Sequence, residues 1–140
     1  MKKIYSVICV LLGLCLSVSA QTANVLRIPD ATATPGKPSA LSVYMDNASE
    51  VVGLQFTVSV PQGMSLSQGD IVFDTRGEDH IASIKQIEMG NYLCMVYSPT
   101  NKPLRGYTGK LFDVNFTIAD SFTDGSVHPM ALKDVVLGDA

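Results

Sequence analysis

The chain has 140 residues, a length that fits one domain with a core large enough to stabilise it. Its 13 acidic residues outnumber its 10 basic residues, and no run of basic residues follows the first three positions. This charge balance argues against nucleic acids and anionic membranes as partners, because both attract basic surfaces.

The first twenty residues have the layout of a secretory signal peptide. Lys2 and Lys3 provide a positive start, residues 4–16 are almost all apolar, and small residues precede a cleavage position after Ala20. The apolar run is shorter than the ~20 residues that a membrane-spanning helix needs. We therefore expect an exported protein that is secreted or held at the cell surface.

The mature domain is then expected to cover residues 21–140. Lipidation at Cys15 is disfavoured because the bulky Leu14 precedes it. Removing the signal leaves 10 − 2 = 8 basic residues against 13 acidic ones. Only Cys94 remains, so no internal disulfide can form, and its apolar neighbours predict a small buried hydrophobe. The ending VVLGDA does not resemble a natural terminus, which suggests the N-terminal part of a longer protein.

Short strands separated by turn-forming residues are expected throughout the mature chain. In chain order, the segments with strand character are residues 24–28, 41–45, 54–60, 71–74, 80–88, 91–98, 110–118 and 127–137, the last holding one or two strands. Residues 61–70 are expected to form a loop with one short strand at most. We find no convincing helix, no repeat and no low-complexity segment.

Two of these segments predict a hairpin. HIASIKQIE also places isoleucines at a helical spacing, but its β-branched residues and the bracketing Asp79 and Gly90 favour a strand. The bend is predicted at Gly90-Asn91, before NYLCMVYS.

The fold class predicted from this pattern is an all-β sandwich of about eight or nine strands. The expected core comprises Leu41, Val43, Leu54, Phe56, Val58, Leu111, Val114, Phe116 and Ile118. Phe112 is out of register with Leu111, so one of the two must face outward or lie at a β-bulge.

The order of the motifs resembles that of a cohesin domain. Pro35-Gly36, an alternating strand at residues 41–45, Asn47, and the Gly53–Phe56 spacing correspond to its first third, and GKLFDVNFTIAD resembles a later strand. The resemblance covers residues 24–137 and implies a jelly-roll sandwich, a fold that cohesins share with carbohydrate-binding modules. The middle, residues 79–101, is similar to secreted proteins of Bacteroidetes.

In cohesins a dockerin module docks on one sheet face, so the resemblance implies a protein-binding face here. Carried over by position, the implied contact residues are polar and point outward. They are Asn47, Gln55, Thr57, Ser59, Asp113, Asn115 and Thr117. Amides and hydroxyls suit a hydrogen-bonded interface, but an ordinary solvated sheet face has the same pattern.

Carbohydrate recognition is the second hypothesis. Tyr97 and Tyr107 flank a loop with the hydrogen-bonding side chains of Asn101 and Arg105, and such a set can hold a sugar ring. The mature chain has no tryptophan, which disfavours a flat platform for crystalline cellulose. Tyrosine in a sandwich is more often an ordinary strand or corner residue.

Catalysis and metal binding are not predicted. The chain has none of the common nucleophile, zinc or dithiol motifs, and His80, in GEDH, is expected in a solvated loop. Asp74, Glu78 and Asp79, and separately Asp120 and Asp124, are acidic loop residues, but no calcium loop is complete. Calcium is therefore an unsupported alternative, and we expect no cofactor.

These observations predict a secreted, non-catalytic binding module. Its partner is expected to be another secreted protein or a polysaccharide, in extracellular polysaccharide use or adhesion. A spacer domain of a cell-surface protein, with no ligand of its own, is the alternative.

Overall fold

The computed structural model describes residues 23–123 and 125–139, with Gln68 and Asp70 described by their backbone alone. The predicted signal peptide, residues 1–20, and Asp124 lie outside these ranges. Within them, no helix is long and apolar enough to cross a membrane.

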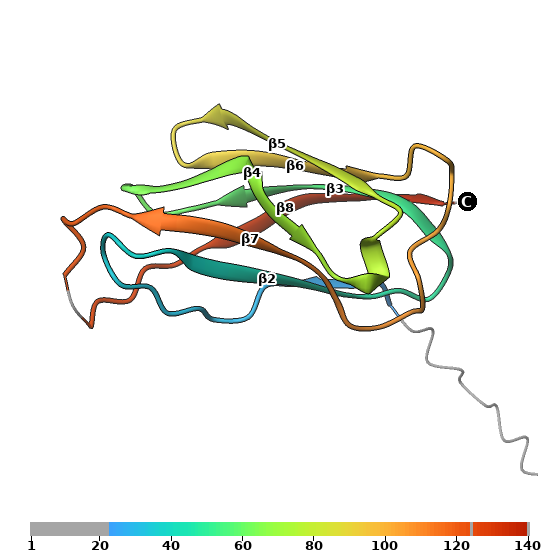
Figure 1. The fold of residues 1–140 in the computed structure, drawn as a ribbon, viewed down its shortest axis with the longest axis horizontal. Coiled ribbons are helices and arrows are strands. Elements are labelled where there is room, and N and C mark those ends of the chain that lie inside the picture. The colour runs from blue at the N-terminus through green and yellow to red at the C-terminus, as the bar shows by residue number, and fades with distance from the viewer. Residues whose placement is uncertain (1–22, 124, 140) are drawn as a thin grey trace, which may run out of the picture.

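Eight strands and one short 3-10 helix make up the described part of the chain (Figure 1). The strands are β1 (Val25–Arg27), β2 (Ser39–Asp46), β3 (Val51–Ser59), β4 (Met64–Phe73), β5 (Ile81–Glu88), β6 (Asn91–Tyr97), β7 (Lys110–Ile118) and β8 (Ala131–Asp139), and the helix is η1 (Thr75–Gly77). Sheet A has the order β1-β2-β7-β4, and sheet B has the order β5-β6-β3-β8. The prediction of an all-β sandwich is confirmed.

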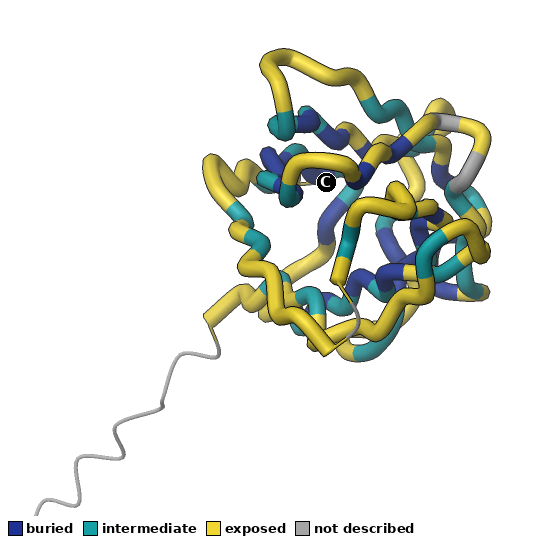
Figure 2. The backbone as a smooth tube through the Cα atoms, turned by 90° about the vertical axis from the view of Figure 1, so that its left-hand side faces the viewer, coloured by how far each residue is buried: buried dark blue, intermediate teal, exposed yellow. Residues whose placement is uncertain are grey.

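The core lies between the two sheets, as the alternation of the strands predicts. Phe56 of β3 and Phe112 of β7 stack across the interface with ring centroids 6.5 Å apart. Eight of the nine predicted core residues are buried, and the ninth, Ile118, is partly buried and packs against them. Viewed end-on, the buried stretches lie inside and the loops are exposed (Figure 2). Alternating apolar residues thus supply both inner faces.

A β-bulge resolves the conflict between Leu111 and Phe112. Val43 pairs with Phe112 and Tyr44 pairs with Lys110, so Leu111 is the extra residue on β7. The bulge lets two consecutive side chains be buried, because η1 covers this end of β7, where the Asp74 amide donates to the Leu111 carbonyl at 2.9 Å.

Three sequence expectations need correction. Residues 64–70, expected to form a loop with one short strand at most, continue into the expected strand at residues 71–73 as one strand, β4. The sequence hid this because a register shift between Leu66 and Ile71 interrupts the alternation that marks a strand. The β5–β6 hairpin is confirmed, but its bend is Met89-Gly90, with Gly90 at φ +75°. His80 is buried, not solvated.

Candidate functional site

The outer face of sheet B consists of ladder rows that cross all four strands. Because directly paired residues in an antiparallel sheet point to the same side, the pairings define each row. The first row is Ile81–Tyr97–Gly53–Gly138, the second is Ser83–Met95–Gln55–Val136, and the third is Lys85–Leu93–Thr57–Lys133. We call these three rows the recognition face.

Large apolar side chains are exposed together in the first two rows. Ile81, Met95, Tyr97 and Val136 are 42–58% exposed. Gly53 and Gly138 lie side by side next to Tyr97. Because neither has a side chain, the backbone of the sheet is uncovered at this point of the face. Clustered exposed apolar groups of this kind mark surfaces that bind a partner.

The third row places two lysines on the outermost strands. Lys85 lies on β5 and Lys133 lies on β8, with Leu93 and Thr57 between them. Neither lysine makes an ion pair within the described residues, although Glu88 and Asp134 are close in sequence. The recognition face is therefore apolar at one end and positively charged at the other.

Sheet A presents a different outer face. Asp113 of β7 accepts a hydrogen bond from Ser42 at 2.5 Å and pairs with Lys110 at 2.9 Å, and these contacts lower the pKa of its carboxyl against the opposing effect of burial. At the β1 edge, Arg27 lies over the Tyr44 ring and near Asp46. These charges are already paired within the protein, so fewer unpaired charged groups on this face are left to bind a partner.

The structure separates the residues predicted for partner binding. Gln55, Thr57 and Ser59 point out from β3 in sheet B, whereas Asp113, Asn115 and Thr117 point out from β7 in sheet A. The two sets lie on opposite outer faces and cannot form one surface. The sequence grouped them because alternation identifies outward residues without identifying the sheet. Of the first set, Gln55 is partly exposed, Thr57 is 7% exposed, and Ser59 donates to Asn91 at 2.5 Å.

Asn47 is an internal contact of a buried arginine. Its side-chain oxygen accepts a hydrogen bond from Arg76, and its Nδ2 donates to the Ser49 carbonyl at 2.6 Å. Asn47 is 4% exposed, so it is not available on a surface. The turn signal that sequence reasoning assigned to recognition therefore has a structural role.

The guanidinium of Arg76 joins three segments at one end of the sandwich. It donates to the carbonyls of Met45 at 2.5 Å, Arg105 at 2.8 Å, Gly109 at 3.1 Å and Gly106 at 3.2 Å, in addition to Asn47. Burial lowers the pKa of Arg76, and the nearby Asp46 opposes this effect. Sequence reasoning missed this residue, because nothing in TRGEDH distinguishes a buried arginine from a solvated one.

The structure places the four residues predicted to contact a sugar at the end of β6 and in the loop between β6 and β7. Tyr97 belongs to the recognition face, whereas the Tyr107 carbonyl accepts from the Asn47 amide at 2.8 Å, near the end of sheet A. Arg105 pairs with Glu78 at 2.5 Å and with Asp79 at 3.0 Å. Asn101 is exposed in a left-handed conformation, with φ +57°.

The acidic residues around η1 are engaged in local contacts. Asp74 accepts from the Thr75 amide at the start of η1, at 2.7 Å, and lies 3.5 Å from Lys110. Hydrogen bonds from Lys102 and then Arg105 lower the pKa of Asp79. Over the ranges that the structure covers, no three Asp, Glu, His or Cys side chains gather as metal ligands.

His80 is 5% exposed and lies just before β5. Neither ring nitrogen makes a hydrogen bond of normal geometry. Burial lowers the pKa of His80, although Asp79 and the Val52 backbone favour the protonated ring. A neutral ring is therefore enclosed at the edge of the recognition face, next to Ile81.

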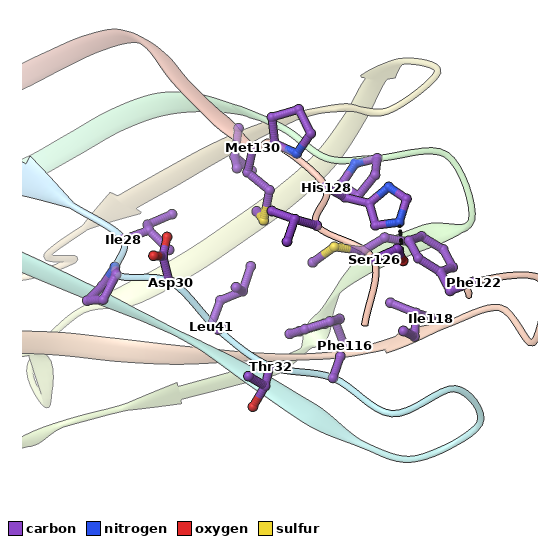
Figure 3. Close-up of a pocket in the computed structure, with 18 of the residues that line it drawn as sticks. Ile28, Asp30, Thr32, Leu41, Phe116, Ile118, Phe122, Ser126, His128 and Met130 are labelled. Atoms are coloured by element: carbon purple, nitrogen blue, oxygen red, sulfur yellow. Dashed lines mark hydrogen bonds between the residues drawn. The ribbon is translucent and has the colours of Figure 1, made fainter. Parts of the chain in front are cut away.

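A cleft of about 900 Å³ lies on the side of the sandwich where β1 and β8 are the edge strands (Figure 3). On the opposite side, β4 and β5 pack together. The walls of the cleft are the segment after β1 and the β7–β8 loop, and its floor includes Leu41 and Phe116. In the β7–β8 loop, the Ser126 hydroxyl and the His128 ring lie 2.8 Å apart. The cleft exposes core side chains, and its Ser126–His128 pair has no acidic side chain bonded to the imidazole among the residues that the structure describes.

Comparison with solved structures identifies the fold as that of cohesin modules. The sixth cohesin of scaffoldin B from Acetivibrio cellulolyticus, crystallised with a mutant Cel5 dockerin, is 17% identical, with a TM-score of 0.67 over 84% of this chain and 87% of that one. A non-cellulosomal cohesin from Archaeoglobus fulgidus is also 17% identical, with a TM-score of 0.62 over 83% and 78% of the two chains.

A third neighbour is a cohesin module from a family 33 glycoside hydrolase of Clostridium perfringens. It is 14% identical, with a TM-score of 0.60 over 82% of this chain and 81% of its own. No protein-family model and no curated protein sequence matches the chain. At these identities the likeness establishes the fold.

Proposed function

We propose that this protein is a secreted, non-catalytic recognition module that binds another protein through the recognition face. The observation that carries the proposal is the clustering of exposed Ile81, Met95, Tyr97 and Val136 on one outer face, in a module whose other face has its charges paired. A partner that covers these side chains removes their apolar surface from water, which favours binding.

Two neighbours with the same fold support a protein partner. The scaffoldin B cohesin was crystallised with a dockerin, and so was a cohesin from Clostridium thermocellum. By analogy, the partner here is a dockerin-like module of another exported protein. The predicted signal peptide supports an extracellular setting, and polysaccharide use or adhesion is the proposed context.

Protein recognition is favoured over the two other hypotheses. Of the predicted sugar contacts, only Tyr97 lies on the recognition face, and Arg105 is already paired with Glu78 and Asp79. A spacer domain has no need of an exposed apolar cluster with two unpaired lysines beside it.

The test is capture of a partner from the secreted fraction of the source organism, followed by binding of the purified partner. Two charge insertions, Gln55→Arg and Met95→Arg, are expected to weaken binding at least tenfold, because a guanidinium in the face must be desolvated. Asn115→Arg on the exposed face of sheet A is the matched control and should bind like the unaltered chain.

Equal binding by all three variants would remove the recognition face from the proposal. A glycan array distinguishes the carbohydrate hypothesis, since sugar binding that is lost in both Tyr97→Ala and Tyr107→Ala would favour it. Absence of any partner in both assays would leave the spacer role.

A further inference from the structure

We infer that the cleft between β1 and β8 binds a small apolar molecule that carries one ammonium group. The apolar part of the ligand lies against the margin of the core, and the ammonium group lies at Asp30. This site does not depend on the recognition face, because the cleft opens at the side of the sandwich where β1 and β8 are the edge strands.

The cleft is apolar at its base because the sandwich is open along this side. β4 and β5 pack together along the opposite side, whereas the edges β1 and β8 leave about 900 Å³ between them. Four lining side chains pack against the core and are only partly buried: Ile28, Ile118, Met130 and Leu132. A ligand that covers them removes apolar surface from water, which favours binding.

The cleft also has the size and the walls of a small-molecule site. Pockets that hold drug-sized ligands measure ~300–1,000 Å³ and are mainly apolar with a few polar groups. The segment after β1 forms one wall and the β7–β8 loop forms the other (Figure 3). Two facing walls of this kind favour a compact ligand over the broad surface of a protein.

The carboxylate of Asp30 is the feature that selects a cation. Asp30 is exposed and makes no hydrogen bond or ion pair with any other residue that the structure describes. Figure 3 shows it beside Ile28, on the wall formed by the segment after β1. Arg27 lines the cleft too, but its guanidinium lies over the Tyr44 ring and 3.7 Å from Asp46. The unpaired charge in the cleft is therefore negative, which complements an ammonium group.

The polar groups of the opposite wall are bonded to one another. Ser126 donates its hydroxyl proton to the Thr123 carbonyl at 2.6 Å, so its oxygen accepts from Nε2 of His128 at 2.8 Å. The His128 ring in turn packs edge-on against Phe122, with centroids 4.6 Å apart. These contacts hold the wall in place and leave Asp30 to determine the charge of the ligand.

The test is isothermal titration calorimetry of the mature chain with octylamine, octanol and octanoate, which share one apolar tail. Octylamine should bind with one molecule per chain and more tightly than octanol, and octanoate should bind most weakly. Each methylene removed from octylamine should weaken binding by up to about fourfold. Asp30→Asn should weaken octylamine binding about three- to fivefold, the range of an exposed ion pair, and leave octanol unaffected. Glu50→Gln removes the same charge at an exposed position outside the cleft and should change nothing.

NMR spectra of the labelled chain locate the site. The methyl signals of Met130 and Ile118 should shift with octylamine, and that of Met95 on the recognition face should stay unchanged. Equal affinities for octylamine and octanol, unaltered binding by Asp30→Asn, or shifts at Met95 alone would overturn the inference. A dimer in sedimentation that excludes octylamine would overturn it as well, because a second copy would then occupy the cleft. None of these results bears on the recognition face, which is tested by its own variants.

Discussion

Replacing Arg76 with alanine tests whether a buried guanidinium holds one end of the sandwich together. The side chain joins the end of β2, the loop between β6 and β7, and η1 through five hydrogen bonds. It also explains why Asn47 is enclosed and unavailable to a partner. The variant removes every donor of this cluster at once and leaves the acceptors in place.

The expected loss follows from which acceptors can regain water. The contacts with the Met45 carbonyl and the Asn47 side chain are buried, whereas the three other carbonyls are partly exposed. An acceptor left buried without a partner costs ~1–3 kcal/mol, and one that regains water costs much less. We expect the free energy of unfolding to fall by about 3 kcal/mol, a loss that a domain with ~5–15 kcal/mol survives.

Urea denaturation measures this change. The midpoint should fall by about 1–2 M for Arg76→Ala. Arg76→Lys should recover part of the loss, because an ammonium reaches fewer of these acceptors than a guanidinium does. Arg105→Ala, which removes exposed ion pairs with Glu78 and Asp79, should cost at most ~1 kcal/mol. A loss below 1 kcal/mol for Arg76→Ala would refute the reasoning.

Two further predictions concern buried titratable groups. The pKa of His80 is lowered in the folded chain, so the unfolded chain takes up a proton first as the pH falls. The free energy of unfolding should therefore decrease below about pH 6.5, by at most ~1.4 kcal/mol per pH unit. Thermal melts of His80→Phe should lack this pH dependence, and an unchanged pH dependence would contradict its assignment to His80. Burial raises the pKa of the Cys94 thiol to about 12, so a thiol reagent at pH 8 should modify Cys94 only after the chain unfolds. A cysteine introduced by Met95→Cys, at an exposed position on the same strand, should react in the folded state. Rapid labelling of Cys94 in the folded chain would contradict this prediction and indicate that the core opens.

The sequence predicts the inner faces of the strands well because burial enforces strict alternation. In β3, Leu54, Phe56 and Val58 point inward and Gln55 points outward, as the pattern indicates. The bulge at Leu111 could be anticipated for the same reason, since two consecutive core residues break a period of two. Where the register shifts, as between Leu66 and Ile71 in β4, the alternation is lost, and the first part of this strand was expected to be mostly loop.

The recognition face could not be assembled from the sequence. Its rows join residues from four strands, and the partners of Gln55 are Met95 on one side and Val136 on the other. Pairings over such separations depend on topology, which alternation leaves open. The enclosed positions of Asn47 and His80 escaped prediction for a related reason: loop residues look solvated until the segments that cover them are known.

The measurement that tests the central claim most directly is an NMR titration of the isotopically labelled chain with its purified partner. Changes in amide shifts should concentrate on the recognition face, at Gln55, Met95 and Lys85, and Asn115 and Thr117 on the outer face of sheet A should stay unchanged. Changes confined to sheet A, or to the loop around Asn101 and Tyr107, would contradict the account.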